Sequence, residues 1–307
     1  MIAAILIFIL GFVFLVKGAD YLIDGATVLA HRFNIPNIVI GLTIVSIGTS
    51  APELVVNIIS GLKGHSEIAL GNVFGSNIAN ILLVLGIGVM LRTLQLNYKH
   101  IRSDLFFLLA STLLLVRFVF DDQVIAWYEG SIFLVMFIIY LFYSFKIRKD
   151  VFTEEEHKIK PFTAIGLFLL GMIMLFLGGR WVVQGVVVFS HMLMLSQALI
   201  ALTAVALGTS LPELTVTIIS IMRNKYEIAI GNAVGSNIFN ILWVLGFGAI
   251  LRPLIFLPKF YLEISLLFIS TILLLIFLKW REKITRMQGI IFLGTYFLYL
   301  IFIFYRN

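Results

Sequence analysis

The stretch Gly48-Thr49-Ser50-Ala51-Pro52-Glu53 interrupts an apolar run that extends from Ile38 to Leu62. Pro52 has no backbone N–H, so the carbonyl of Gly48, four residues earlier, loses its helical partner. Gly48 itself weakens a helix. The sequence therefore predicts a broken helix in which freed carbonyls, two hydroxyls and one carboxylate converge within about one turn. Such hard oxygen ligands suit Na⁺ or Ca²⁺ and are poorly suited to soft metals.

A carboxylate in the middle of an apolar run is costly, and in a membrane segment it usually marks a functional site. Broken backbone at membrane depth is tolerated only where it is buried in protein or lines a wet cavity. The alternative is a proline-kinked helix in which Glu53 is neutral and hydrogen-bonded.

The same stretch occurs again as Gly208-Thr209-Ser210-Leu211-Pro212-Glu213, at an offset of 160 residues (213 − 53). The correspondence runs without a gap from Gly25, matched by Gly185, to Asn80, matched by Asn240. It includes a second motif, Gly-Ser-Asn-Ile, which begins at Gly75 and again at Gly235. The chain therefore consists of two copies of one unit, and each copy supplies one glutamate.

Composition places this chain of 307 residues in a lipid bilayer, with 61% hydrophobic residues, 12% charged residues and a mean hydropathy of +1.09. The absence of cysteine excludes disulfides and thiolate metal sites. The net charge of +6 does not indicate a nucleic-acid partner, because Lys and Arg cluster in loops. The apolar N-terminus lacks a preceding basic segment, which predicts a retained first helix.

Hydropathy predicts an all-α integral membrane protein with ten membrane-spanning segments, five in each copy. Because five is odd, the second copy enters the membrane from the opposite side, which makes an inverted repeat. We expect a first repeat over residues 1–146, a linker over 147–160 and a second repeat over 161–307. The ten segments are 2–24, 36–61, 69–91, 104–120, 127–146, 162–188, 196–221, 229–250, 260–279 and 287–305.

The loops differ strongly in positive charge. One set of loops, which includes 146–160, holds 15 Lys and Arg residues, whereas the opposite set holds 5. Since positive residues are concentrated on the cytoplasmic side, we expect the linker 146–160 to be cytoplasmic and both termini to be extracellular, in a multi-pass protein of the cell membrane.

The second polar stretch of each repeat reads as one face of a helix. Asn72, Ser76 and Asn80 are spaced at i, i+4 and i+8, beside a strip of small residues that lets another helix approach. The copy provides Asn232, Ser236 and Asn240. Ligation of a cation is favoured for the serines and for Asn80 and Asn240, and interhelical hydrogen bonding is the alternative. For Asn72 and Asn232 the two interpretations stay open.

These motifs, GTSAPE with GNVFGSNIAN and GTSLPE with GNAVGSNIFN, resemble the two alpha-repeats of the calcium/cation antiporter superfamily, sodium/calcium exchanger type. The resemblance covers nearly the whole chain and includes motif order, spacing and duplication. It implies that broken helices 2, 3, 7 and 8 form the ion site. It also implies that helices 1 and 6 lie outside them as a tilted, sliding pair.

The resemblance also implies a set of metal ligands. Calcium is expected to bind Glu53 and Glu213 and the backbone carbonyls of Thr49 and Thr209. Asn240 stands where potassium-dependent members carry aspartate, which puts potassium co-transport in doubt. The sodium sites are expected to use both glutamates, the hydroxyls of Ser50, Ser76, Ser210 and Ser236 and the carbonyls of Ser46 and Ala206, with Asn80 and Asn240 in the remaining central positions.

The residues alone leave the coupling ion open. Two carboxylates balance one Ca²⁺, two Na⁺ or two protons, and burial favours neutralisation in each case. The four serine hydroxyls favour sodium, because extra neutral ligands are redundant for carrying protons. The expected function is an antiporter that exchanges sodium for calcium by alternating access, with electrogenic calcium extrusion. The alternative is a proton-coupled exchanger of calcium or another divalent cation.

Two other classes are less consistent with the sequence. A channel needs weak, multi-site binding along a continuous pore, whereas an inverted repeat with one central glutamate pair favours alternating access. An enzyme is disfavoured, because the chain has no nucleophile–base arrangement and no HExxH motif. We expect no cofactor and no catalytic residue, with Ca²⁺ and Na⁺ as the transported substrates.

Three charged residues near membrane ends have two interpretations. Asp20 and Asp24 lie late in the first segment, and Arg180 corresponds to Asp20 in the repeat. They either form an interhelix or gating ion pair or reach the polar headgroups from the ends of long helices.

Overall fold

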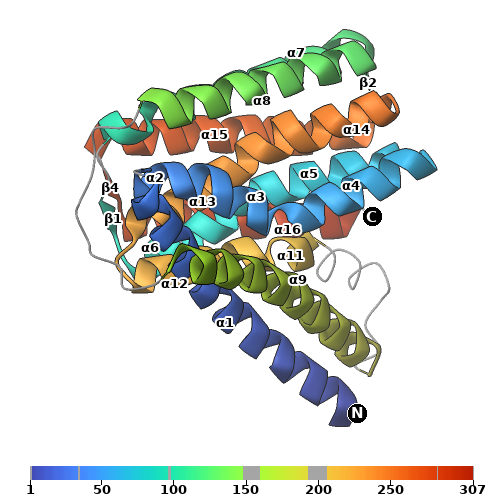
Figure 1. Cartoon of the computed structure of the whole chain (residues 1–307). Helices are drawn as coiled ribbons and strands as arrows, with labels where there is room; N and C mark the ends of the chain where they lie inside the picture. Colours follow the sequence, from blue (N-terminus) through green and yellow to red (C-terminus); the bar gives the residue numbers. More distant parts are fainter. Residues whose placement is uncertain are drawn as a thin grey trace.

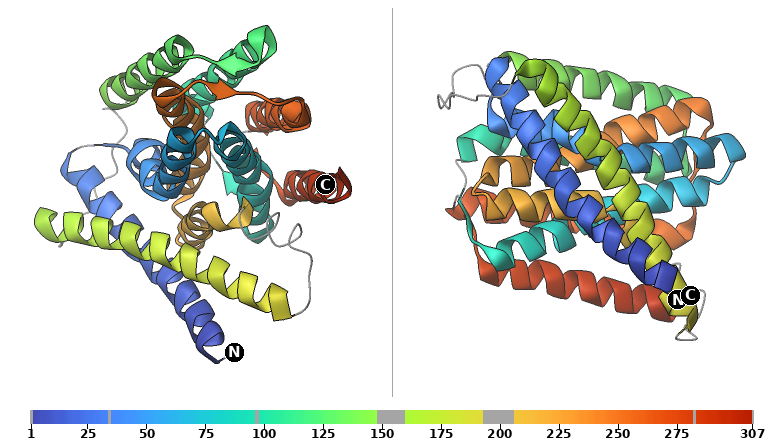
Figure 2. Two further views of the ribbon diagram at one scale, coloured as in Figure 1. Left: turned by 90° about the vertical axis from the view of Figure 1, so that its right-hand side faces the viewer. Right: turned by 60° about the horizontal axis from the view of Figure 1, so that its bottom comes forward.

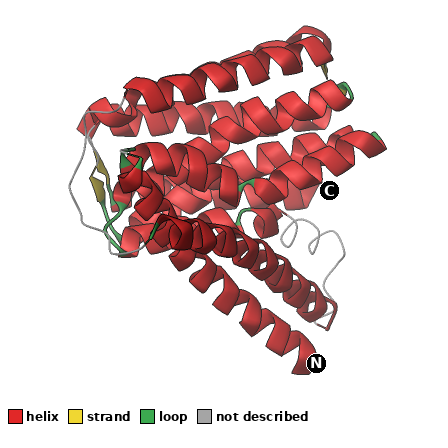
Figure 3. Ribbon diagram, in the orientation of Figure 1, coloured by secondary structure: helices red, strands yellow, loops and turns green. Residues whose placement is uncertain are grey.

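The computed structural model describes residues 2–33, 35–95, 98–147, 160–192, 206–281 and 283–306. These residues are almost entirely helical, with four strands of two residues each (Figure 3). Within these described ranges, eight helices are long and apolar enough to cross a membrane, and one bent pair can form a ninth span. Most of the helices run roughly parallel or antiparallel in one bundle, with α1 and α9 tilted across it (Figure 1).

The first repeat contains five membrane segments; the second is broken at Ser50, and the third is one continuous span, Ser66–Leu91, that contains a π-helical turn. The elements are α1 (Ile2–Arg32), then α2 (Asn37–Ile40), η1 (Gly41–Val45), α3 (Ser46–Thr49) and α4 (Ala51–Lys63), then α5 (Ser66–Ile78), η2 (Ala79–Val84) and α6 (Leu85–Leu91), followed by α7 (Tyr98–Asp122) and α8 (Trp127–Ile147).

The second repeat follows the same order. Residues 196–205 of the predicted segment 196–221 lie outside the described residues, and so does most of the linker 147–160. The elements are α9 (Pro161–Met192), then α11 (Ala206–Thr209) and α12 (Leu211–Met222), then α13 (Tyr226–Phe239), η4 (Asn240–Leu245) and α14 (Gly246–Leu251), followed by η5 (Pro258–Phe260), α15 (Tyr261–Arg281) and α16 (Arg286–Arg306).

Helix α1 is longer than predicted, because it continues past residue 24 to Arg32. Its 31 residues span about 46 Å, which exceeds the hydrocarbon thickness of a bilayer, so the helix must tilt. Figure 2 shows α1 and α9 side by side, running diagonally across one face of the bundle. The polar residues near position 24 therefore do not end the helix.

Glycines bring α1 and α9 into close contact. Gly11 and Gly18 of α1 recur at the same seven-residue spacing as Gly171 and Gly178 of α9. A Cβ atom at Gly178 would lie 2.8 Å from the Gly11 carbonyl oxygen, and one at Gly18 would lie 2.9 Å from a backbone nitrogen of α9. The two backbones approach so closely only because these side chains are absent.

The apolar residues form two separate cores. The larger core lies inside the bundle of broken helices and their neighbours. The smaller core joins α1 and α9 to that bundle, through Leu15, Leu22 and Leu175 on the pair and Val45 and Val216 on the bundle. The α1–α9 pair therefore packs as a body with its own apolar interface.

Two short ribbons join the repeats. Strand β1 (Leu94–Gln95) pairs antiparallel with β4 (Lys283–Ile284), and β2 (Val124–Ile125) pairs antiparallel with β3 (Leu254–Ile255). Each ribbon takes one strand from each repeat, and Figure 1 shows the two ribbons at opposite ends of the bundle. The repeat offset carries β1 onto β3, so inverting one repeat exchanges the two ribbons, as an inverted repeat requires.

Opposite placement of the repeats can be tested by cysteine labelling, because the chain has no cysteine of its own. Lys63 ends α4 and Lys283 lies in β4, and these elements end at opposite faces of the bundle (Figure 1). In sealed vesicles, a membrane-impermeant maleimide should label Lys63→Cys and Lys283→Cys from opposite sides. Labelling of both from one side would contradict the inverted arrangement.

Candidate cation site

Both GTSxPE motifs break their helix at the serine. Ser50 has φ −87° and ψ 11°, and Ser210 has φ −88° and ψ 1°, which lie outside helical geometry. In the first repeat the segments before and after Ser50 differ in direction by 48°. Pro52 and Pro212 then lie in the first turn of the next helix, where the missing N–H is tolerated. The break stands where the sequence predicts it.

The glutamates occupy equivalent places. Glu53 lies in the first turn of α4 and Glu213 in the first turn of α12, and both are fully buried. The N-terminus of a helix favours negative charge through its free N–H groups and its dipole. Each broken helix thus supports one carboxylate in the interior of the bundle.

Hydroxyls connect the two repeats at these carboxylates. Ser50 Oγ donates to Glu213 Oε1 at 2.7 Å, across the repeats, and Ser76 Oγ donates to Glu53 Oε1 at 3.2 Å. The Ser76 and Thr209 hydroxyl oxygens are 3.4 Å apart. Thr49 and Ser236 form the matching pair, also at 3.4 Å. Of the four serine hydroxyls expected at the site, those of Ser50 and Ser76 therefore donate to the glutamates. The Ser236 hydroxyl lies beside that of Thr49, and Ser210 Oγ is buried without a hydrogen-bond partner among the described residues.

Several oxygens at the site have no hydrogen-bond partner. Among the described residues, no donor reaches Glu53 Oε2, Glu213 Oε2, Asn80 Oδ1 or Asn240 Oδ1, although all four atoms are buried. A buried acceptor left without a partner costs about 1–3 kcal/mol. Two repeat-related pairs of such oxygens, two of them on carboxylates, form a donor set that suits a hard cation.

The asparagines beside the site bind one another. Asn80 Nδ2 donates to Asn237 Oδ1 at 3.1 Å, and Asn240 Nδ2 donates to Asn77 Oδ1 at 3.2 Å. Asn237 Nδ2 donates in turn to the Asn77 carbonyl at 3.1 Å. With its nitrogen held in this way, each central amide keeps its oxygen free. The sequence analysis missed Asn77 and Asn237, although both belong to the duplicated Gly-Ser-Asn motif.

The structure favours interhelical hydrogen bonding for Asn72 and Asn232. Asn232 Nδ2 donates to the Glu213 carbonyl and to Thr217 Oγ1, both at 3.1 Å, and its Oδ1 accepts from Thr49 at 3.0 Å. Asn72 makes the equivalent contact with the Glu53 carbonyl at 3.5 Å. These amides support the broken helices that carry the glutamates.

The carbonyls of Ser46 and Ala206 are the two expected ligands that precede the helix breaks. The Ser46 carbonyl accepts from Ser50 N at 3.0 Å and from Thr49 Oγ1 at 3.2 Å, so helical bonding already engages it. Ala206 is the first residue of α11, and its side chain lies outside the described part of the chain.

Among the described residues, three π-helical turns widen the helices around the site: η1 in helix 2, η2 in helix 3 and η4 in helix 8. Asn80 lies within η2, and Asn240 begins η4. Such turns leave local backbone groups in altered pairing and are frequent at functional sites. No residue pattern in the sequence distinguishes them from regular helix, so they were not predicted.

Inverted repeats whose broken helices meet at a buried, repeat-related set of oxygens define a secondary transporter of cations. A family model described as "Sodium/calcium exchanger protein" matches residues 3–146 and 163–305. The chain therefore belongs to the sodium/calcium exchanger family, a family of membrane transporters. This result confirms the superfamily to which the motifs point.

Individual relatives agree. The chain is 30% identical to the sodium/calcium exchanger MaX1 of Methanosarcina acetivorans, over 98% of each chain. It is 35% identical to a putative antiporter, CaxA, of Alkalimonas amylolytica, over 98% of this chain and 99% of the relative. A solved structure of the sodium-calcium exchanger NCX_Mj matches with a TM-score of 0.83 and 32% identity, over 97% of each chain. The all-helical architecture with inverted repeats is thus confirmed.

The asparagine contacts predict coupling between Asn237 and Asn80. If Asn237 acts by orienting the Asn80 amide, Asn237→Ala and Asn80→Ala should each weaken calcium binding, and the double variant should be no weaker than Asn80→Ala alone. Calorimetric titration of the purified protein measures this. Asn57→Ala is the control, because this buried amide bonds to the Ala69 carbonyl instead. Additive losses would show that Asn237 does not act through Asn80.

Proposed function

We propose that this chain exchanges Na⁺ for Ca²⁺ by alternating access at one central site, and extrudes calcium electrogenically with the sodium gradient. The observation that carries the proposal is the buried pair Glu53 and Glu213, each with one carboxylate oxygen that accepts no hydrogen bond from the described residues. Membership in the sodium/calcium exchanger family and similarity to an exchanger of that name support it.

The proposed ligand roles follow from the type of oxygen at each position. Both glutamates and the carbonyls of Thr49 and Thr209 bind Ca²⁺, which takes six to eight oxygen ligands. Asn80 and Asn240 contribute their open amide oxygens. Sodium uses the same carboxylates together with the hydroxyls of Ser50, Ser76, Ser210 and Ser236 and the carbonyls of Ser46 and Ala206.

The arrangement in the membrane is part of the proposal. We divide the chain into a first repeat (1–146), a cytoplasmic linker (147–160) and a second repeat (161–307), with both termini outside. The charge of the loops supports this orientation, because 15 Lys and Arg residues fall on the proposed cytoplasmic side and 5 on the other.

The charge of the site determines how transport responds to voltage. Asn80 and Asn240 are neutral, so the site carries at most two negative charges. One Ca²⁺ neutralises it, whereas three or more Na⁺ leave it positive. Returning these two loads in opposite directions moves net charge across the membrane. Proton coupling is the second candidate, because two protons also neutralise the pair, but it leaves the surrounding hydroxyls without a role.

Removing one carboxylate charge should abolish calcium exchange. Glu53→Gln or Glu213→Gln leaves a single carboxylate for a divalent ion in a buried site, a loss of about 3–5 kcal/mol, or more than about 100-fold in affinity. Sodium-driven calcium-45 uptake into proteoliposomes measures the loss. The matched control is Glu67→Gln, because Glu67 is 56% exposed in a surface pair with Lys259. Near-native exchange by either site variant would refute the assignment.

The flux should also depend on membrane potential. In vesicles loaded with sodium, calcium uptake exports net positive charge, so an inside-positive potential should accelerate it, and an inside-negative potential should slow it. The bias is about 2.3 kcal/mol per charge for each 100 mV. A proton ionophore at clamped potential should leave the flux unchanged. A flux that ignores potential, or that collapses with the pH gradient, would favour electroneutral or proton-coupled exchange instead.

A further inference from the structure

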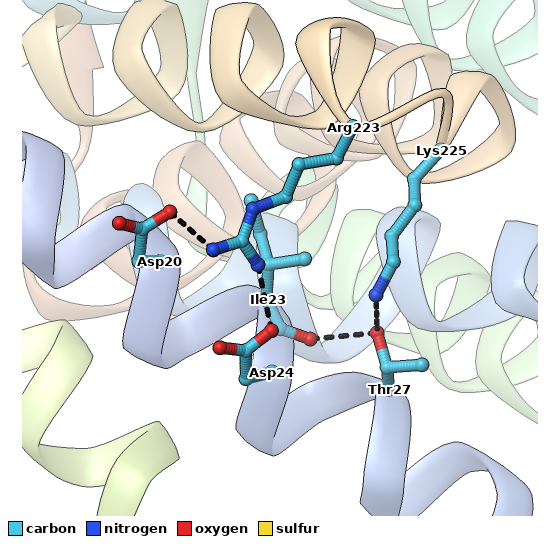
Figure 4. A network of polar contacts seen from close by, with 6 residues as sticks. All are labelled: Asp20, Ile23, Asp24, Thr27, Arg223 and Lys225. Atoms are coloured by element: carbon cyan, nitrogen blue, oxygen red, sulfur yellow. Dashed lines mark hydrogen bonds and ion pairs between the residues drawn. The ribbon is translucent and has the colours of Figure 1, made fainter.

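A polar cluster fixes α1 to the turn between α12 and α13 (Figure 4). Arg223, the residue after α12, places Nη2 2.5 Å from Asp20 Oδ1 and Nη1 2.6 Å from Asp24 Oδ1. Two residues further on, Lys225 Nζ donates to Thr27 Oγ1 at 2.8 Å. Asp20 and Asp24 therefore form an interhelix ion pair, and their partner is Arg223, not the repeat-related Arg180.

This cluster joins the two bodies of the fold. Asp20, Asp24 and Thr27 lie on α1, which packs with α9 through glycines and meets the bundle across the smaller core. Arg223 and Lys225 belong to the bundle, at the end of the broken helix that carries Glu213. Between these contacts, Ile23 is fully buried. The interface between α1 and the bundle is therefore closed at this end, where α12 meets α13. We call this end the α1 face, and the repeat-related end at α9 and α4 the second face.

The repeat-related positions have different charges. The offset of 160 residues carries Asp20 onto Arg180 and Asp24 onto Gln184, and it carries Lys63 onto Arg223. The related positions thus hold two basic residues and an amide, whereas the first set holds one arginine and two carboxylates. The sequence of the second face provides no acid to match the pair.

The second face is also open. A cavity of about 440 Å³ lies between α4, α9 and the α11–α12 break. Arg180, Val183 and Gln184 line it from α9, and Val56 lines it from α4. It reaches Thr209, whose hydroxyl lies 3.4 Å from that of Ser76. Val183 corresponds to the buried Ile23, so equivalent positions are open on one face and closed on the other.

We propose that Asp20, Asp24 and Arg223 form a one-sided latch that closes the α1 face of the site and biases the protein toward the conformation open at α9. The planar guanidinium presents two nitrogens to two carboxylates, which a lysine cannot do. The three side chains remain 22–42% exposed. A pair of this exposure is weak enough to break in each cycle and strong enough to shift a two-state population.

The latch rests on the proposed alternating access, and cysteine accessibility tests it without any ion flux. Val56→Cys reports the open face and Ile23→Cys the closed face, in a chain otherwise free of cysteine. Each is labelled with a membrane-impermeant maleimide from its own side of a proteoliposome. Arg223→Gln should raise the labelling rate of Ile23→Cys about fivefold and lower that of Val56→Cys.

Further variants separate the latch from loss of folding. Asp24→Asn should shift both reporters in the same direction as Arg223→Gln, and combining the two should add nothing to Arg223→Gln alone. Arg223→Lys should lie between Arg223→Gln and the native residue. Arg117→Gln is the control, because Arg117 pairs with Asp121 on the exposed surface of α7.

A converse variant builds the latch on the other face. Arg180→Asp and Gln184→Asp together with Lys63→Arg reproduce the acid–arginine arrangement there, and labelling of Val56→Cys should fall. Size-exclusion chromatography shows whether Asp24→Asn and the triple variant are folded. If both variants elute like the native protein and the labelling rates of Ile23→Cys and Val56→Cys are unchanged, the ion pair is structural only and the latch is refuted. A separate measurement of calcium uptake distinguishes the two proposals. If uptake does not depend on sodium while the labelling rates still shift as expected, the proposed exchange function is refuted and the latch is not.

Discussion

Two carboxylates held together inside a membrane protein are the constraint to which most of this structure responds. Glu53 and Glu213 cannot be buried without compensation, because removing a charge from water costs several kcal/mol even after relaxation. The helix breaks at Ser50 and Ser210 supply free N–H groups beside them. The hydroxyls of Ser50 and Ser76 donate to them. What these groups leave uncompensated is the pair of open oxygens that suits a cation.

The asparagines show how selective this compensation is. The Asn232 amide nitrogen donates to the Glu213 carbonyl and to Thr217, and its oxygen accepts a hydrogen bond from Thr49. Asn80 and Asn240 each donate a hydrogen bond from the amide nitrogen, to Asn237 and Asn77 respectively. Residues of one type in one motif therefore differ in which of their amide atoms are hydrogen-bonded, and the oxygens of Asn80 and Asn240 accept no hydrogen bond from the described residues.

Much of the fold was predictable, because it is encoded in local chemistry and in duplication. Proline and glycine at fixed positions locate the helix breaks, and an odd number of segments per repeat implies inversion. The π turns at Asn80 and Asn240 were not predictable, because no residue pattern there differs from that of a regular helix. The ribbons were missed because two-residue strands are too short to show alternation.

Side-chain partners across the repeats were the least predictable part of the site. The repeat offset links Asp20 to Arg180, which suggests that the two belong to one feature, but equivalent positions in an inverted repeat lie on opposite faces. The actual partner, Arg223, lies about 200 residues away from Asp20 in sequence. Sequence symmetry identifies equivalent positions, whereas contact depends on which faces the helices present to each other.

The residues at the central site and the residues around α1 and α9 determine two different properties of such a transporter, which are ion selection and the preference for one open face. At the centre the proposed side-chain ligands are matched between the repeats, as in Glu53 and Glu213, Ser76 and Ser236, and Asn80 and Asn240. A site of matched halves favours neither face, so it can determine which ions bind but not which face is open. Preference between faces must therefore come from unmatched residues, and the charges around α1 and α9 are unmatched. Such a preference shifts populations and apparent affinities, whereas the direction of net transport is set by the ion gradients.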